Sequence, residues 1–361
     1  MDSERFFRAM VEQDASDLFL KVGNRPFLRI HGRLLPVGAE RVTREHITAL
    51  VSGLLEPQQR QRLHAQRELT IAFERPGLGR FRANVLWQQG TMALVIRRIQ
   101  RVIPTLSELG LPGVVLTRLL TEAYGLVLVT GPPGAGKSTA AASMLDHVNH
   151  TAAKHLVTLE DPIEFHFEEE QAIINQREIG ADTLSFSEGL RNVLQQSPDM
   201  LFVSDIRDAQ TMDACLVAAE SGQLVLSCIH TTNAVTTVER LVGFAPLHQH
   251  QCIRLRLSLI LRGILSLRLL PRLDGAGRVP VCEVLVATPT VRELIREGRT
   301  ERLPAVIHDG AMYGMQTFTQ ALYHRYRQGE VDLAEALRSA DSPEELQLAV
   351  RDIHATGDVQ S

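Results

Sequence analysis

The stretch GLVLVTGPPGAGKST, residues 125–139, decides the fold of this chain. An apolar run leads into a glycine-rich loop and then into an alanine-rich window, so it predicts strand, loop and helix in that order. The loop fits G-x-x-x-x-G-K-[ST], a spacing in which backbone N–H groups and the helix N-terminus bind phosphate. The predicted phosphate-binding residues are Gly131, Pro132, Pro133, Gly134, Ala135, Gly136, Lys137, Ser138 and Thr139.

Two side chains of this loop carry specific chemistry. Lys137 is predicted to reach the β- and γ-phosphates of ATP, and Ser138 to bind Mg²⁺. The chain has only three lysines against thirty-five arginines, so composition alone does not explain a lysine at this position. The sequence therefore predicts ATP and Mg²⁺ as cofactors.

Downstream of the loop, short apolar strands at 155–161, 200–205 and 223–230 alternate with helical windows. This alternation predicts an α/β fold with a mainly parallel sheet and helices on both faces. After about residue 248 we expect helices. The apolar segment 255–271 is predicted to be a buried helix, because three arginines interrupt it too often for a membrane span.

A chain of 361 residues is long enough for two domains. Residues 1–100 predict a small α+β domain that ends in a hairpin at 81–99, where apolar and polar residues alternate. Residues 101–116 contain several prolines and glycines and are predicted to be a linker. Residues 117–361 are the predicted ATPase domain, with a helical C-terminal portion.

Acidic residues follow two of the predicted strands. TLEDPIEF (158–165) places Glu160, Asp161 and Glu164 beyond a strand end, where ligands bind in open α/β sheets. We expect Glu160 and Asp161 to join Ser138 around Mg²⁺, and Glu164 to align water. A solvated turn is the alternative, since Asp161-Pro162 is itself a turn signal.

The stretch LFVSDIRD (201–208) runs out of the next strand into Asp205. Its position predicts a general base, although Asp205 could instead only accept hydrogen bonds from nearby backbone N–H groups.

Composition excludes several functions. The formal net charge of −4 gives no overall attraction to nucleic acid or anionic lipid. The first residues show no signal peptide, so we expect a cytoplasmic protein without membrane insertion. Four cysteines without a C-x-x-C pair predict free thiols and no metal cage.

Several stretches together resemble the PilT/PilU retraction motors of type IV pili, which are secretion-type hexameric ATPases. They are TLEDPIEF, QREIGADTLSFSEGLRNVLQQSPDM (176–200), CIHTTNA (228–234) and GMQTFTQAL (314–322). The similarity runs from residue 15 to residue 350. GMQTFTQAL and ALRSADSPEEL (336–346) resemble the PilU branch more than PilT.

The resemblance implies a PAS-like N-terminal domain and a RecA-like P-loop ATPase domain in a homo-hexameric ring. It implies an ATP-hydrolysing motor for pilus retraction and twitching motility, of the accessory PilU kind. Such motors work at the inner face of the cytoplasmic membrane through an inner-membrane platform protein. A PilT-like paralogue is the implied second partner, and no direct contact with nucleic acid is implied.

The resemblance also implies roles for single residues. The strand that ends at Asp205 usually ends in Gly-Glu in this family, and the glutamate prepares the attacking water. Here the pair is Ser204-Asp205, with a stem one methylene shorter, so slow turnover is expected. His230 would sense the γ-phosphate, and Arg82 and Arg97 would approach the nucleotide of a neighbouring subunit.

Three other functions stay open. The chain could be a nucleotide-binding partner subunit with little hydrolysis of its own. It could be a pilus-extension or type II secretion ATPase, although those commonly carry paired C-x-x-C zinc ligands that are missing here. A RecA-like DNA motor is disfavoured by the acidic balance.

Overall fold

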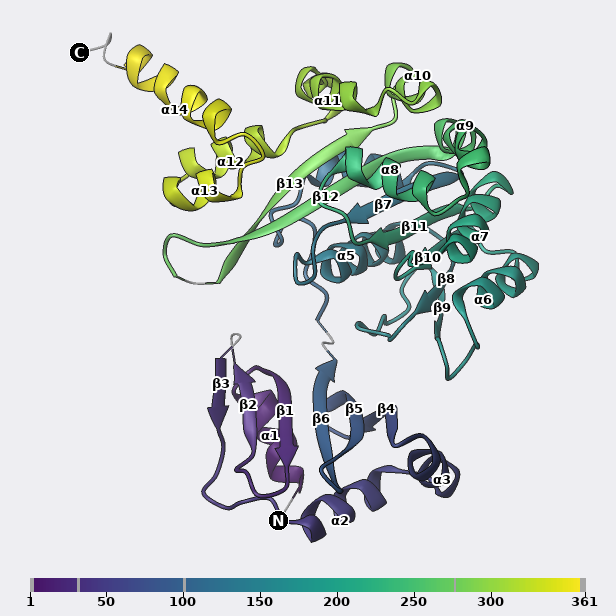
Figure 1. The fold of residues 1–361 in the computed structure, drawn as a ribbon, viewed down its shortest axis with the longest axis vertical. Helices are drawn as coiled ribbons and strands as arrows, with labels where there is room; N and C mark the ends of the chain where they lie inside the picture. Colours follow the sequence, from purple (N-terminus) through teal and green to yellow (C-terminus); the bar gives the residue numbers. More distant parts are fainter. Residues whose placement is uncertain (1–2, 31–32, 100–101, 276, 358–361) are drawn as a thin grey trace. The chain divides into compact units, whose positions relative to one another are not determined.

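The computed structural model describes residues 3–30, 33–99, 102–275 and 277–357, and within these ranges it describes side chains from residue 4 to residue 351. The chain forms two compact units, Met1–Val102 and Ile103–Ser361 (Figure 1). The predicted boundary at residues 100–101 lies outside the described residues. Residues 103–116 of the predicted linker belong to the second unit, where Leu106 and Leu111 are buried in the core beside helix α4 (Gly113–Leu120).

The first unit is a six-stranded antiparallel sheet in the order β3-β2-β1-β6-β5-β4. Its elements are α1 (Ser3–Glu12), β1 (Ala15–Lys21), β2 (Phe27–Ile30), β3 (Arg33–Pro36), α2 (Arg44–Leu54), α3 (Pro57–Gln66), β4 (Glu68–Arg75), β5 (Gly79–Gln88) and β6 (Thr91–Ile99). The predicted hairpin is β5–β6, in which Phe81, Ala83 and Val85 are buried and alternate with less buried neighbours. This alternation gives the sheet one covered face, as the pattern indicated.

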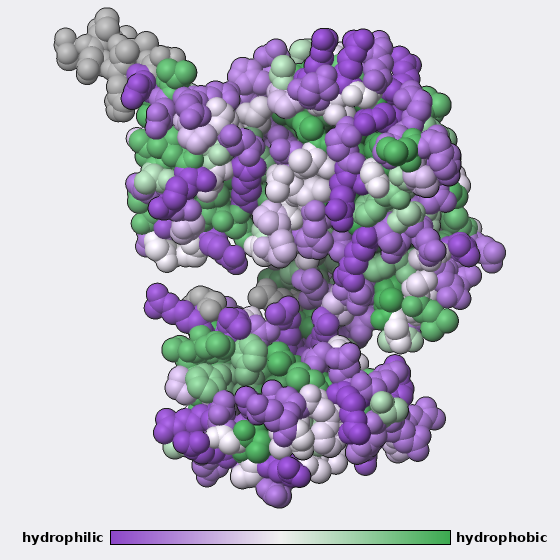
Figure 2. All heavy atoms as spheres, in the orientation of Figure 1, coloured by the Kyte–Doolittle hydropathy of each residue, from purple (hydrophilic) through white to green (hydrophobic). Residues whose placement is uncertain are grey.

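The edge strand β3 carries apolar side chains at the surface. Leu34 and Leu35 are 50% and 46% exposed, and hydrophobic surface gathers over β2 and β3 in Figure 2. An unpaired edge with apolar side chains is a place where another chain can pack.

The second unit contains a seven-stranded sheet in the order β13-β12-β7-β11-β10-β8-β9. All neighbouring pairs are parallel except β12 and β13. The elements up to the hairpin are β7 (Gly125–Thr130), α5 (Lys137–Thr151), β8 (His155–Glu160), β9 (Ile173–Glu178), α6 (Phe186–Val193), η1 (Leu194–Gln196), β10 (Met200–Val203), α7 (Ala209–Glu220), β11 (Leu224–Ile229), α8 (Ala234–Gly243), η2 (Leu247–Gln249), α9 (His250–Ile260), β12 (Leu261–Pro271) and β13 (Arg278–Val286).

Apolar cores lie on both faces of this sheet. Helices α4 and α5 cover one face, and α6 to α9 cover the other together with two later helices (Figure 1). The prediction of a mainly parallel sheet covered on both faces is therefore confirmed.

The prediction of one buried helix over residues 255–271 is wrong. Helix α9 ends at Ile260 and the chain continues as β12, which lies between β7 and β13. A strand covered on both faces is apolar throughout, so periodicity does not separate it from a buried helix. Arg262, at the start of β12, is buried but satisfied, since its Nε donates to the Tyr124 carbonyl at 2.9 Å. Among the described residues, no helix combines the length and apolar character needed to cross a membrane.

Short helices follow the hairpin and complete the unit. They are α10 (Pro289–Glu297), η3 (Thr300–Arg302), α11 (Leu303–Asp309), η4 (Ala311–Tyr313), α12 (Phe318–Arg327), α13 (Leu333–Ser339) and α14 (Pro343–Gly357). Phe318 and Leu322 of α12 share an apolar core with Leu270 and Val281 of the hairpin. The guanidinium of Arg268 lies 3.8 Å from the centre of the Phe318 ring, which fixes these helices to β12.

Candidate active site

The glycine-rich loop connects the buried strand β7 to helix α5 as predicted. A side chain at Gly131 would meet the Leu267 carbonyl at 2.6 Å, so the backbone approaches β12 too closely for any other residue. Gly136 has a φ of 89°, a left-handed conformation that favours glycine, and α5 starts at the next residue. The loop thus presents the N-terminus of a 15-residue helix, which favours bound anions.

Lys137 is held inside this loop. Its Nζ donates to the carbonyls of Gly131 and Pro132, at 2.9 and 3.1 Å. The same Nζ lies 3.0 Å from Nδ1 of His230, which follows β11. Burial lowers the pKa of Lys137. The predicted lysine therefore sits where phosphate oxygens would replace the carbonyls.

Asp205 completes this cluster. It is 5% exposed, and its Oδ2 accepts from Arg207 Nε at 2.8 Å and lies 3.3 Å from His230 Nε2. Its Oδ1 is buried and has no hydrogen-bond partner among the described residues. The structure thus brings together three predicted residues, with His230 between the lysine and the carboxylate.

Among the acidic residues after β8, Glu164 is the one that meets Ser138. Ser138 Oγ donates to Glu164 Oε1 at 3.0 Å; Ser138 is half-buried and Glu164 is exposed. Hydroxyl and carboxylate oxygens are the ligands that Mg²⁺ prefers, so these two residues fit a magnesium ion next to the phosphate loop. The sequence had instead predicted that Glu164 aligns the attacking water and that Glu160 and Asp161 bind Mg²⁺.

Glu160 has another environment. It is 4% exposed, and its Oε1 accepts from Thr158 Oγ1 at 2.7 Å and from Gln176 Nε2 at 3.1 Å. Burial raises its pKa to about 7. Gln176 also donates to the Phe165 carbonyl at 2.9 Å, so this network holds the segment that carries Glu164. In the described structure Glu160 makes no hydrogen bond to Ser138.

Asp161, the other predicted magnesium ligand, faces a cation. Its Oδ2 accepts from Arg207 Nη1 at 2.8 Å, and its backbone N–H donates to Ser204 Oγ at 3.1 Å. Arg207 and Ser204 were missed as functional residues. Both belong to the stretch LFVSDIRD (201–208). Their shared partner, Asp161, lies more than forty positions earlier in the chain, and no local sequence pattern indicates this contact.

Arg82 and Arg97 lie in the first unit. They are opposite each other on β5 and β6, and Arg97 Nε forms an ion pair with the buried Asp17 at 2.8 Å. Their expected role toward the nucleotide of a neighbouring subunit stays a prediction.

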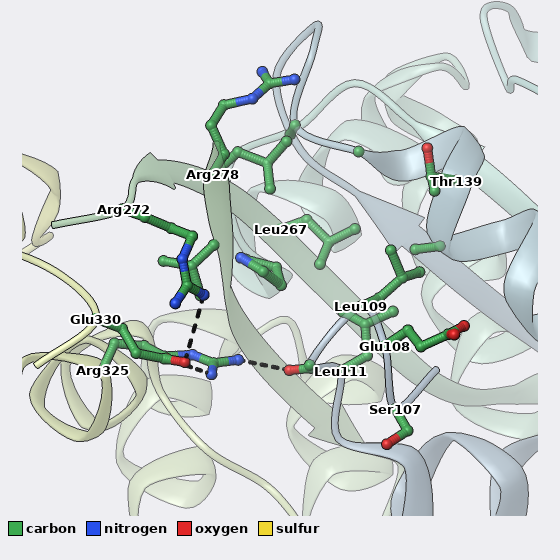
Figure 3. A pocket seen from close by; sticks show the side chains of 17 residues that line it. Ser107, Glu108, Leu109, Leu111, Thr139, Leu267, Arg272, Arg278, Arg325 and Glu330 are labelled. Carbon is green, nitrogen blue, oxygen red and sulfur yellow. Dashed lines mark hydrogen bonds and ion pairs between the residues drawn. The ribbon is translucent and has the colours of Figure 1, made fainter. Parts of the chain in front are cut away.

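A pocket of about 340 Å³ begins at the phosphate loop (Figure 3). Gly136 and Thr139 form one side and Leu267 and Leu269 of β12 form another. Charged residues form the far wall: Arg325 donates to Glu330 Oε2 at 2.7 Å and to the Gly110 carbonyl at 2.6 Å, and Arg272 lies 3.8 Å from Glu330. A cavity with one apolar side and one charged wall, next to an anion site, suits the base and sugar of a nucleotide.

A phosphate loop, a lysine within it and carboxylates at the ends of neighbouring parallel strands define a P-loop nucleotide-binding protein. The chain belongs to the family of Type II/IV secretion system proteins, whose model matches residues 3–276.

Relatives match this chain over nearly its whole length. It is 39% identical to the type IV pilus ATPase PilU of Pseudomonas aeruginosa, over 97% of this chain and 92% of the relative. It is 37% identical to the retraction ATPase PilT of the same organism, over 95% and 99%. The crystal structure of the pilus retraction motor PilT with bound ADP superposes with a TM-score of 0.89, at 38% identity, over 96% and 99% of the two chains.

These relatives confirm the resemblance that the sequence motifs indicated, and the higher identity to PilU agrees with the expected branch. The shared structure confirms the predicted fold class, a RecA-like P-loop domain preceded by a small α+β domain.

Proposed function

We propose that this chain is an ATP-hydrolysing motor subunit for type IV pilus retraction and twitching motility, of the accessory kind that PilU represents. The observation that carries the proposal is the cluster of Lys137, His230 and Asp205 at the phosphate loop. Similarity to PilU and PilT along nearly the entire chain supports the motor assignment over other P-loop activities.

In the proposed reaction, loop N–H groups and the α5 N-terminus bind the phosphates of ATP. Lys137 exchanges the Gly131 and Pro132 carbonyls for phosphate oxygens and neutralises charge that develops during transfer. Ser138 and Glu164 would hold Mg²⁺, which supplies further neutralisation of the phosphates when bound. Oδ1 of Asp205, which has no hydrogen-bond partner within the described part of the chain, accepts the proton of the attacking water.

The assembly of this motor is part of the proposal. We expect a homo-hexameric ring in the cytoplasm that acts on an inner-membrane platform protein alongside a PilT-like paralogue. In this ring Arg82 and Arg97 would approach a neighbouring nucleotide, where an arginine contributes about 10³–10⁵ in rate in other nucleotide hydrolases. The apolar edge at Leu34 and Leu35 gives the first unit a surface that packing could cover.

The test is ATP hydrolysis by the purified protein beside Lys137→Ala. We expect Mg²⁺-dependent hydrolysis in the wild type and a loss of at least about 100-fold in the variant, because the main phosphate cation is removed. Lys154→Ala is the matched control. Lys154 is one of the three lysines of the chain, and it lies outside the phosphate loop. Hydrolysis retained in Lys137→Ala would refute the site assignment.

A nucleotide-binding partner subunit is the second candidate. The observation in its favour is that Oδ2 of Asp205 already forms ion pairs with Arg207 and His230. The side chain of Asp205 is also one methylene shorter than the glutamate usual at this position in the family. That function predicts tight ATP binding with negligible turnover by the wild type, and turnover that rises in Asp205→Glu.

A further inference from the structure

One guanidinium joins the ends of two neighbouring strands. Arg207 lies in the turn between β10 and α7, two residues after Asp205. Its Nε donates to Asp205 Oδ2 and its Nη1 donates to Asp161 Oδ2, both at 2.8 Å. Asp161 directly follows β8, which pairs with β10 in parallel. The same side chain therefore bridges carboxylates from two strands.

Ser204 forms a second connection between the same strand ends. Its Oγ accepts from the Asp161 N–H at 3.1 Å, and its own N–H donates to the Leu159 carbonyl at 2.9 Å. Asp161 opens the segment that leads to Glu164, whose carboxylate accepts from Ser138. The position of Glu164 is thus connected to the end of β10 through Asp161.

Asp205 depends on these contacts for its orientation. Its side chain is 8% exposed, and both of its ion-pair partners, Arg207 and His230, engage the same oxygen. A charge-assisted hydrogen bond on Oδ2 restricts the carboxylate and leaves Oδ1 as the oxygen that can accept a proton. The planar fork of arginine can serve both carboxylates at once, whereas the single ammonium of lysine cannot reproduce this geometry.

We infer that Arg207 is a positioning residue for ATP hydrolysis, which orients Asp205 and ties it to the segment that carries Glu164. This inference rests on the proposed ATPase function. It assigns Arg207 no contact with the nucleotide, so its loss should lower kcat and leave the KM for ATP nearly unchanged.

The test compares steady-state hydrolysis by the full-length wild type, Arg207→Ala and Arg207→Lys at saturating ATP and Mg²⁺. We expect kcat to fall about 10- to 100-fold in Arg207→Ala, with KM changed less than about threefold, because a misplaced reacting group costs this much. Guanidinium ion, added well below denaturing concentrations, should restore part of the rate of Arg207→Ala, and sodium chloride at equal ionic strength should not. Arg207→Lys should recover less than full activity.

Arg299→Ala is the matched control. Arg299 is 54% exposed, against 53% for Arg207, and it too forms an ion pair with a carboxylate two residues away, Glu297. We expect it to hydrolyse ATP at the wild-type rate.

The outcomes separate the two proposals. If the wild type hydrolyses ATP and Arg207→Ala matches Arg299→Ala, the positioning role is wrong and the ATPase function stands. A reduced rate without rescue by guanidinium, or with KM raised in proportion, also overturns the positioning role. If the wild type hydrolyses no faster than Lys137→Ala, the ATPase function itself is wrong and this inference falls with it.

Discussion

Two buried carboxylates at the ends of neighbouring strands differ in the charge of their partners. Glu160, the last residue of β8, accepts hydrogen bonds from the neutral groups of Thr158 and Gln176. Asp205, just after β10, faces Arg207 and His230. Burial raises the pKa of Glu160 to about 7, and neutral donors do not offset it. Burial alone therefore does not identify a reactive carboxylate. The hydrogen-bond partners of the carboxylate, neutral or charged, separate a structural role from a catalytic one.

The largest effect is expected from Asp205→Asn. This change keeps the shape of the side chain and removes its charge, so the proton acceptor is lost. We expect kcat for ATP hydrolysis to fall by about 10²–10⁴-fold, the usual contribution of a general base. ATP binding, measured by a fluorescent analogue, should change little. A variant that hydrolyses at the wild-type rate would show that Asp205 has only a structural role.

Glu160→Gln should change stability in a pH-dependent way. In the wild type the carboxyl has a pKa of about 7 when folded and 4.5 as its ordinary value, so the folded state holds the proton over this range. The contribution of Glu160 to the free energy of unfolding is therefore fully present below pH 4.5 and is lost as the pH rises to about 7. At about 1.4 kcal/mol per pH unit, the loss amounts to about 3 kcal/mol.

Glutamine does not titrate, so Glu160→Gln should gain stability relative to the wild type as pH rises from 5 to 8. Thermal denaturation of the two proteins in parallel measures this gain. An unchanged difference across the range would contradict the raised pKa.

Ser138→Ala tests the third carboxylate, Glu164, through its partner. Loss of a hydroxyl ligand should raise the Mg²⁺ concentration for half-maximal hydrolysis by about 10-fold, as even outer-sphere changes do at metal sites. Ser138→Thr keeps the hydroxyl and should stay near the wild type. A Mg²⁺ requirement unaffected by Ser138→Ala would remove this pair from the magnesium site.

The smallest effect is expected from Asp161→Asn. The ion pair of Asp161 with Arg207 is half exposed, and such pairs contribute little, so kcat should stay within about threefold of the wild type. The amide oxygen can still accept from Arg207. A loss of 10-fold or more, together with a raised Mg²⁺ requirement, would instead support the role as a magnesium ligand that the sequence indicated.

The phosphate loop could be predicted because its chemistry is local. Nine consecutive residues, from the end of a strand into the first turn of a helix, specify it, and Gly131 and Gly136 are required by backbone geometry that the motif already encodes. Asp205 could be predicted as a general base from its position after a strand, whereas the place of His230 near the γ-phosphate followed only from the resemblance to the PilT/PilU motors.

The remaining features depend on contacts that no local pattern carries. Which carboxylate of TLEDPIEF meets Ser138 depends on the path of the segment, and that path is held by Gln176 from the edge strand β9. The bridge from Arg207 to Asp161 joins residues from separate strands. Strand β12 was mistaken for a helix because a doubly buried strand and a buried helix have the same continuous apolar sequence.

The most direct test of the central claim is the ratio of single-turnover hydrolysis rates in Glu160→Gln and Asp205→Asn, both saturated with ATP and Mg²⁺. Each variant replaces one buried carboxylate by its neutral isostere, so the two differ mainly in whether the lost carboxylate faces neutral groups, as in Glu160, or Arg207 and His230, as in Asp205. We predict that Glu160→Gln keeps its rate within about 10-fold of the wild type, while Asp205→Asn loses at least about 100-fold. Equal losses in the two variants, or a greater loss in Glu160→Gln, would contradict the division between a structural and a reacting carboxylate.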